Sequence, residues 1–411
     1  MSKLKKRWMR QSILAMSTVI VTGSILCGCS RQEMTRTISL PDIEDEGKGI
    51  SGIVIKNIQE YTYGGHSEDN LRLAWGKTGS NTAIQLRYEE EGYVYRKIDI
   101  NTKETISKEF MDDRMVSNIQ IAPGGRYVSY EAEPAKKASP ELVVFLAEEG
   151  EHIVLREWNE SLQFFSYIWS DDGTKLFSWQ DGDNYAFSPD TDWCVTCYDM
   201  ETVKQDSNGG LSIEKKEFRM EGNGHAWRHV LPNADGTKVY VREEYESFSD
   251  SKEKEYSENQ EIKKKKAAKN WLIMPEKQEI KKLQEYADEL VNPVKYTKKG
   301  LYFQKEGKLL LVENPEDTPS VKELFRVAGM EVNICGNGDH IFLIEWMDDL
   351  QSMQLSGVKL EGTEPTAKQA LYKASFEGGD CISADDSAIV LQGYEYLEND
   401  RCNFKVMELG Y

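Results

Sequence analysis

The sequence lacks the short motifs that identify the most familiar catalytic folds. It has no G-x-S-x-G segment, no H-E-x-x-H segment and no glycine-rich phosphate-binding loop. It therefore does not indicate a nucleophile-elbow hydrolase, a zincin or a P-loop protein. Histidine is rare, and the five residues are scattered at His66, His152, His225, His229 and His340. We predict no catalytic residue, no metal site and no cofactor.

Cysteine is also scarce. Beyond residue 29 only five cysteines occur, and an odd number argues against a complete disulfide framework. Two of them, Cys194 and Cys197, form a C-x-x-C pattern, which occurs in thiol redox pairs and in half of a metal site. However, WCVTCY is typical of a β-strand, in which residues three apart face opposite sides, and no second C-x-x-C follows. We interpret both cysteines as buried structural thiols.

Long apolar runs are absent after the first 29 residues. No stretch of about 18 apolar residues occurs there, so no transmembrane helix is predicted in that part of the chain. The N-terminal residues combine a basic segment that ends at Arg10 with an apolar run over residues 13–26. This run is too short to span a membrane comfortably, and the combination is typical of an export signal.

The apolar run ends in Leu26-Cys27-Gly28-Cys29, which resembles the bacterial lipobox. There, an aliphatic and two small residues precede the cysteine that is lipidated and becomes the new N-terminus. The resemblance implies a lipoprotein signal peptide over residues 1–28, lipidation of Cys29, and extracytoplasmic attachment to the cell membrane. The alternative is an ordinary secretory signal with two incidental cysteines. Cys27 matches less well, because Leu26 directly before it is large.

The charge of the remaining chain is strongly acidic. The formal net charge of the whole sequence is −19 at pH 7, and such a surface repels the phosphates of nucleic acid. We therefore expect no nucleic-acid partner. Residues 29–48 are polar and end in an acidic cluster, as is typical of a tether that lifts a domain off the membrane.

A hydrophobic–turn–hydrophobic pattern recurs along the rest of the chain. Its clearest copy is FSYIWSDDGTKLFSW, residues 165–179, where apolar and polar residues alternate on both sides of a turn. In the turn, Asp171 and Asp172 can bond to their own backbone, and Gly173 can adopt a positive φ. Six further anchors follow the same pattern, at Gly79, Gly125, Gly236, Gly300, Gly338 and Asp386.

Successive anchors lie 38 to 64 residues apart, a range that includes the period of four-stranded propeller blades. WSDDGTKL followed by CYDMETVK resembles the TolB-type and prolyl-oligopeptidase-type propeller repeat, which carries a W-S-x-D-G turn. The resemblance implies an all-β fold, a single β-propeller over residues 49–411 with seven blades of four antiparallel strands. We expect a first strand within residues 49–63 to pair with the C-terminal NFKVMEL and close the ring, and we expect a monomer.

Three consecutive blades have long segments after their second strand, namely 131–141, 180–193 and 243–270. Ring geometry predicts that they emerge on the same rim. The segment 180–193 is unusually aromatic and acidic, so it is either packing or a ligand-binding loop. Its predicted ligand-binding residues are Trp179, Asp181, Asp183, Tyr185, Phe187, Asp190, Asp192 and Trp193. Residues 278–290 could alternatively form a short helix.

Together these features favour a cell-surface lipoprotein whose propeller binds a protein, peptide or glycan partner without catalysis. One alternative is a propeller enzyme of the lyase or glycosidase type, with its site at the central channel. Another is an accessory subunit of an envelope transporter or signalling complex.

Overall fold

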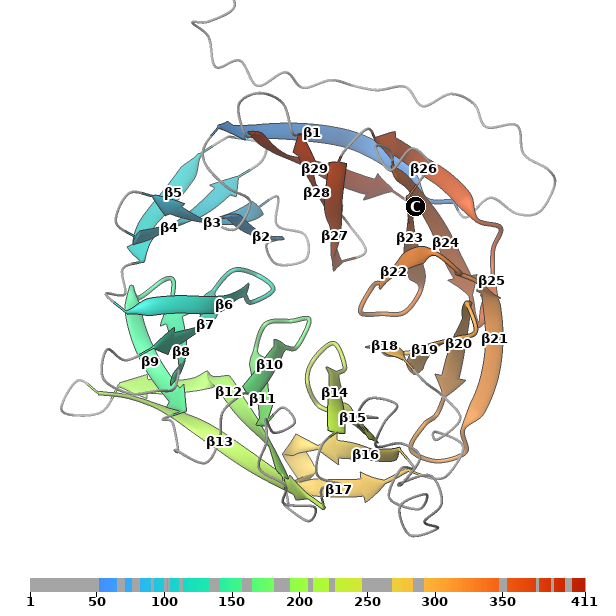
Figure 1. Cartoon of the computed structure of the whole chain (residues 1–411), viewed down its shortest axis with the longest axis horizontal. Helices are drawn as coiled ribbons and strands as arrows, with labels where there is room; N and C mark the ends of the chain where they lie inside the picture. Colours follow the sequence, from blue (N-terminus) through green and yellow to red (C-terminus); the bar gives the residue numbers. More distant parts are fainter. Residues whose placement is uncertain are drawn as a thin grey trace, which may run out of the picture. The chain divides into compact units, whose positions relative to one another are not determined.

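The computed structural model divides into two compact units, Met1–Arg36 and Thr37–Tyr411, and every residue that it describes lies in the second (Figure 1). The predicted signal peptide, Cys29 and the tether lie outside the described residues. Within these residues, no helix has the length and apolar character needed to cross a membrane. The described residues are 52–64, 71–75, 82–89, 92–99, 102, 104–110, 114–133, 141–156, 165–180, 193–205, 210–221, 226–245, 268–283, 292–346, 353–374, 377–385, 388–395 and 401–410.

Seven antiparallel sheets follow one another around a ring in the second unit (Figure 1). Sheet 1 contains β2 (Leu71–Trp75), β3 (Thr82–Glu89), β4 (Gly92–Asp99) and β5 (Thr105–Phe110). Sheet 2 contains β6 (Met115–Ile121), β7 (Tyr127–Glu133), β8 (Glu141–Leu146) and β9 (Glu151–Arg156). Sheet 3 contains β10 (Phe165–Trp169), β11 (Lys175–Gln180), β12 (Trp193–Gln205) and β13 (Leu211–Met220). Sheet 4 contains β14 (Ala226–Pro232), β15 (Val239–Tyr245), β16 (Lys269–Met274) and β17 (Glu279–Lys282). Sheet 5 contains β18 (Pro293–Tyr296), β19 (Leu301–Lys305), β20 (Lys308–Glu313) and β21 (Ser320–Arg326). The fold is therefore the predicted all-β propeller.

Sheet 6 departs from the four-stranded plan. It contains β22 (Met330–Ile334), β23 (His340–Trp346), β24 (Met353–Glu361), β25 (Glu364–Pro365) and β26 (Gln369–Ala374). The short strand β25 ends at a proline, which has no N–H with which to continue the ladder. The chain pairs with β24 again as β26, so the outer edge of this sheet is made in two pieces.

Sheet 7 joins the two ends of the propeller. It contains β27 (Glu377–Asp385), β28 (Ala388–Glu395), β29 (Arg401–Gly410) and, as its outermost strand, β1 (Val54–Gly64). The strand β1 pairs with β29 in antiparallel register from Val54 opposite Gly410 to Gly64 opposite Arg401. The prediction that the N-terminal strand closes the ring with the C-terminal one is thus confirmed.

The core lies between neighbouring sheets, because both faces of a sheet are covered in this architecture. Between sheets 3 and 4, for example, Phe177 and Val195 pack in one cluster with Val230 and Val241. Full burial of an apolar side chain of this size stabilises the fold by roughly 1.5–3 kcal/mol. The apolar residues of the alternating pattern therefore form the contacts that hold neighbouring sheets together.

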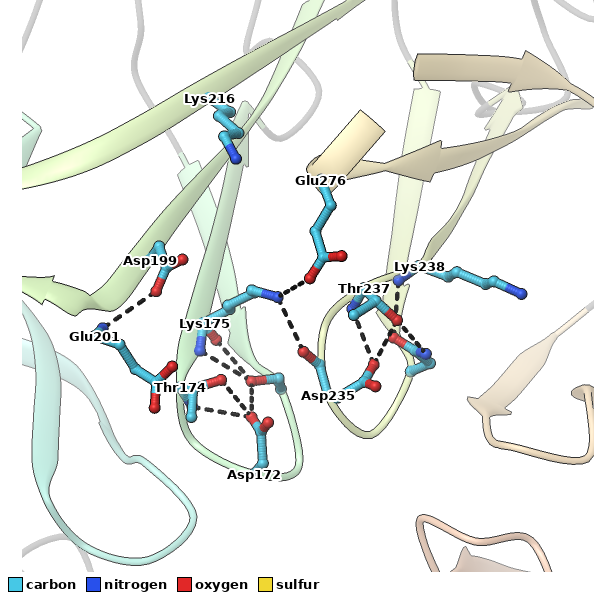
Figure 2. Close-up of polar contacts among 12 residues, drawn as sticks. Asp172, Thr174, Lys175, Asp199, Glu201, Lys216, Asp235, Thr237, Lys238 and Glu276 are labelled. Carbon is cyan, nitrogen blue, oxygen red and sulfur yellow. Dashed lines mark hydrogen bonds and ion pairs between the residues drawn. The ribbon is translucent and has the colours of Figure 1, made fainter. Parts of the chain in front are cut away.

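The five predicted anchors that the structure describes lie between the first and second strands of a sheet, and the best copy has the expected chemistry. Gly79 and Asp386 lie outside the described residues. In the turn that joins β10 to β11, the Asp172 carboxylate accepts hydrogen bonds from the Thr174 backbone N–H at 3.0 Å and its hydroxyl at 2.8 Å. The Ser170 hydroxyl donates to the same oxygen at 2.6 Å. Figure 2 shows this turn beside its counterpart in sheet 4. Asp171, expected to act in the same way, instead pairs with Lys295 of sheet 5.

The counterpart turn in sheet 4 repeats this chemistry and is bonded to sheet 3. Asp235 accepts from the Thr237 backbone N–H at 3.0 Å. Burial raises the pKa of Asp235, but hydrogen bonds from Thr237 and Asn233 outweigh it and leave that pKa below its ordinary value. Lys175 of sheet 3 reaches the Asp235 carbonyl oxygen at 3.3 Å and Glu276 at 3.5 Å (Figure 2). These contacts fasten one blade to the next.

The alternative of a short helix over residues 278–290 is wrong for its first part. The chain passes through one 3₁₀ turn, Pro275–Lys277, and Gln278 takes a left-handed conformation with φ 53°. The next residues form β17, which pairs with β16. The ladder with the neighbouring strand thus prevails over the helical spacing of apolar residues; residues 284–290 lie outside the described part.

Candidate functional site

The two ends of the ring have different connections. At one end, which we call the turn end, the first turns join first to second strands. At the other, which we call the connection rim, second strands lead to third strands. The three long segments predicted to share a rim do follow the second strands of sheets 2, 3 and 4, between β7 and β8, β11 and β12, and β15 and β16.

The predicted ligand-binding loop is described only at its two ends. Trp179 and Trp193 are 7% and 2% exposed and belong to the core between sheets 3 and 4. Trp193 packs edge-on against Trp271, with ring centroids 6.0 Å apart. These two indoles, expected to contact a ligand, are therefore core packing. The other predicted residues, Asp181, Asp183, Tyr185, Phe187, Asp190 and Asp192, lie outside the described residues.

A buried ion pair lies beside Trp193 at the connection rim. Arg228 of β14 and Glu243 of β15 are cross-strand partners, and Arg228 Nη2 lies 3.3 Å from Glu243 Oε1. Their side chains are 6% and 0% exposed. The Arg228 guanidinium carbon also lies 4.5 Å from the centroid of the Trp193 ring, an attractive cation–π arrangement. The first residue of β12 is thus held by an aromatic ring and a cation.

A second polar cluster lies on the opposite face of sheet 4, at the same end. Arg242, 2% exposed, donates to the side-chain oxygen of Asn270 at 3.2 Å and pairs with Glu244. The Tyr240 hydroxyl donates to the same Asn270 oxygen at 2.6 Å. Because successive strand residues face opposite sides, Arg242 and Glu243 place one charge on each face of β15. Both clusters lie where β15 ends and the long predicted insertion begins.

A third cluster lies on the innermost strand of sheet 2. The register between β6 and β7 shifts between Ser117 and Gln120, and within this bulge Asn118 has φ 48°. Its side-chain amide donates to Glu131 Oε1 at 2.7 Å. Burial raises the pKa of Glu131, the negative charge of Glu133 adds to the effect, and the hydrogen bond from Asn118 opposes it. Bulges with a left-handed residue other than glycine concentrate near functional sites.

Tyr167 connects this cluster to sheet 3. Its hydroxyl donates to the Asn118 carbonyl oxygen, and Gln120 donates to the Tyr167 carbonyl oxygen at 3.1 Å. Burial raises the pKa of Tyr167, and the charge on Glu131 raises it further. Asn118 thus joins a half-buried carboxyl from β7 and a buried phenol from β10, and the raised pKa makes that phenol a weaker acid than free tyrosine.

The cysteine pair has no such chemistry. Cys197 is 3% exposed and lies in the core between sheets 3 and 4, and burial raises its pKa to about 12. Burial also raises the pKa of Cys194, and both thiols are free. The interpretation as a buried structural thiol is confirmed for Cys197, whereas Cys194 is only half-buried. In the part of the chain that the structure describes, no group of three or more His, Cys, Asp or Glu side chains is arranged to hold a metal ion.

No protein-family model and no curated protein sequence matches the chain. Among solved structures, it is similar to a prolyl endopeptidase analysed for inter-domain dynamics, with TM-score 0.51 and 11% identity over 80% of this chain and 46% of that one. An oligogalacturonate lyase from Vibrio parahaemolyticus has TM-score 0.50 and 12% identity over 88% and 98% of the two chains. An oligogalacturonate lyase in complex with manganese has TM-score 0.52 and 11% identity over 87% and 97%.

These likenesses show the β-propeller fold. The chain spans about half the length of the prolyl peptidases that it matches and nearly the whole length of the oligogalacturonate lyases. Sequence reasoning missed the polar clusters of sheets 2 and 4. The sequence held one indication of the sheet 4 clusters. The apolar run of β15 continues directly into Arg242-Glu243-Glu244, so the alternation of the strand predicts that at least one of these charged side chains is buried.

Proposed function

We propose that this protein is a cell-surface lipoprotein whose β-propeller binds a protein, peptide or glycan partner at the connection rim, without catalysis. The register of sheet 7 supports this most directly. β28 ends at the rim, where Glu395 lies opposite Arg401, so β29 starts there and ends at the turn end. Since Val54 pairs with Gly410, β1 starts at the turn end. The chain that would carry an anchor at Cys29 therefore enters the propeller at the turn end, opposite the proposed binding rim.

Anchoring is tested first, by lipid labelling of the Cys29→Ala variant. We expect loss of label and loss of the protein from the membrane fraction, because the thiol that carries the diacylglyceryl group is gone. Two acyl chains give lasting attachment, whereas one is marginal. Full labelling of Cys29→Ala would exclude this residue as the anchor, and Cys27→Ala serves as the matched control that should retain the label.

Binding at the rim is tested separately. Tyr185, Phe187 and Asp190 are replaced by alanine, while the buried Trp179 and Trp193 are left intact so that the core is not disturbed. We expect partner capture from envelope extract to fall. A control variant with Glu148, Glu149 and Glu361 replaced changes exposed residues at the opposite end, two in a turn and one at the end of β24, and should bind normally. Equal capture by both folded variants would contradict a binding rim.

A central-channel enzyme is the second candidate, and the cluster of Asn118, Glu131 and Tyr167 favours it. Two of the similar structures are oligogalacturonate lyases, so uronate-containing oligosaccharides are the first substrates to screen. If the channel is catalytic, Glu131→Gln should abolish turnover while the propeller remains folded. Capture of transporter or kinase subunits at the rim would instead favour an accessory role.

A further inference from the structure

Two sheets that are not neighbours touch at the turn end. Asp171 lies in the first turn of sheet 3, and Gly336 lies in the first turn of sheet 6. A Cβ at Gly336 would be 2.8 Å from Asp171 Oδ2 and 3.7 Å from Asp171 Cβ. Sheets 4 and 5 separate these two sheets along the ring. The contact therefore runs across the centre of the ring and not along its circumference.

The intervening sheets join the same contact. The Asp172 backbone N–H donates to the Ala234 carbonyl oxygen of sheet 4 at 2.9 Å, and a Cβ at Gly336 would lie 3.3 Å from Ala234 Cβ. From sheet 5, Lys298 N–H donates to the Gly336 carbonyl oxygen at 3.3 Å. These contacts bring together one turn or inner strand from each of four consecutive sheets.

An ion pair on the channel side also joins sheets 3 and 5 at this contact. Lys295, on the innermost strand of sheet 5, forms an ion pair with Asp171 Oδ1, and both side chains are 28% exposed. The absence of a side chain at Gly336 is what lets sheet 6 approach this carboxylate. We call Asp171, Ala234, Lys295, Lys298 and Gly336 the turn cluster.

We propose that the turn cluster closes the central channel at the turn end, so that the channel is a blind pocket entered from the connection rim. Propellers are built around such a channel, and an opening at both ends would let solutes enter from either side. Contact across the ring among the turns of sheets 3 to 6 is the observation from which we infer that the rim is the entrance. A ligand that reaches Asn118 on the innermost strand β6, or Glu131 beside it on β7, then passes the rim first. The proposal depends on neither lipidation nor catalysis.

The contact across the ring is tested by a disulfide. In Asp171→Cys/Gly336→Cys the two Cβ atoms would be 3.7 Å apart, within the range of about 3.5–4.5 Å that a disulfide requires. Replacing Asp171 by cysteine also removes the carboxylate oxygen that a Cβ at position 336 would otherwise approach too closely. We expect the link to form on mild oxidation, as read by peptide mapping under non-reducing conditions. The control, Asp171→Cys/Glu316→Cys, sets the same turn against an outer turn of sheet 5 and should not cross-link.

Access to the channel is tested in the linked protein. Ser117 is an exposed residue of the innermost strand of sheet 2, and Ser117→Cys reports entry of a bulky maleimide. A channel already closed at the turn end gives the same labelling rate with and without the link. A link that slows labelling several-fold, or a link that does not form in a folded protein, would overturn the proposal.

A variant without added bonds keeps the proposal testable if the double cysteine protein does not fold. Asp171→Ala/Lys295→Ala removes the ion pair and shortens both side chains at the turn cluster. We expect labelling of Ser117→Cys to become several-fold faster, because a second entrance opens. An unchanged rate in this folded variant would show that the turn cluster does not control entry.

Discussion

The glycine of the first turn is predicted to join sheets as well as to shape its turn, and Gly173→Ala tests this. Gly173 has φ 69°, and a Cβ there would overlap the carbonyl oxygen of Pro123 in the first turn of sheet 2. The left-handed conformation costs an L-residue roughly 1–2 kcal/mol. Displacing packed backbone adds about 1–3 kcal/mol. We therefore expect a loss of about 2–5 kcal/mol in the free energy of unfolding, measured by urea denaturation.

Gly150 supplies the matched control. It has φ 78°, and a Cβ there would have no neighbour within 4 Å. Gly150→Ala should therefore lose only the conformational part, roughly 1–2 kcal/mol. The difference between the two variants isolates the contact with Pro123. Equal losses would refute the reasoning, because they would mean that sheet 2 does not lie against this glycine.

Three further predictions concern Ser129, Glu131 and Cys197. Trp169 Nε1 donates to Ser129 Oγ at 2.8 Å in the core, so Ser129→Ala should lower the unfolding free energy by about 1–3 kcal/mol, and the loss should shrink in a Trp169→Phe background. The pKa of Glu131 is raised above 4.5 in the folded protein, so over the pH range just above 4.5 the folded protein keeps a proton that the unfolded chain releases. The free energy of unfolding should therefore fall as pH rises from about 4.5 towards the folded pKa. Urea titrations of Glu131→Gln at the same pH values should lack this decline. Cys197, with a pKa of about 12, should resist a thiol-exchange reagent at pH 8 in the folded protein and react once it is unfolded in urea.

The sheet plan could be predicted from the sequence because the repeat is local. The turn at Gly173 carries its own hydrogen-bond acceptors and its own φ requirement, and the alternation beside it determines which residues are buried. Closure by β1 and β29 could also be predicted, since each was left without a partner in an otherwise complete set of blades. The two-part outer edge of sheet 6 could not be predicted. A strand of two residues that ends at a proline, such as Glu364–Pro365, is too short to show a periodic pattern of apolar residues.

The site could be predicted less well, for a physical reason. Aromatic residues at strand ends near a loop are as suitable for the core as for a ligand, and only packing partners distinguish the two. For Trp193 those partners, Arg228 and Trp271, come from sheet 4. The cluster at Glu131 likewise depends on a bulge at Asn118 and on Tyr167 from the next sheet, which the alternation pattern does not reveal.

The two ends of the ring use polar contacts differently, and this difference is a second argument for the rim as the binding face. At the turn end, the contacts of Lys175 with Asp235 and Glu276 join one sheet to its neighbour, which sheet stability alone explains. At the rim, Arg228 and Glu243 are buried as ions. Apolar residues of the same volume are often at least as stabilising in such positions, so stability does not account for them. They fix the strand ends that flank the predicted binding loop, and a fixed base lowers the entropy lost when a loop orders around a partner.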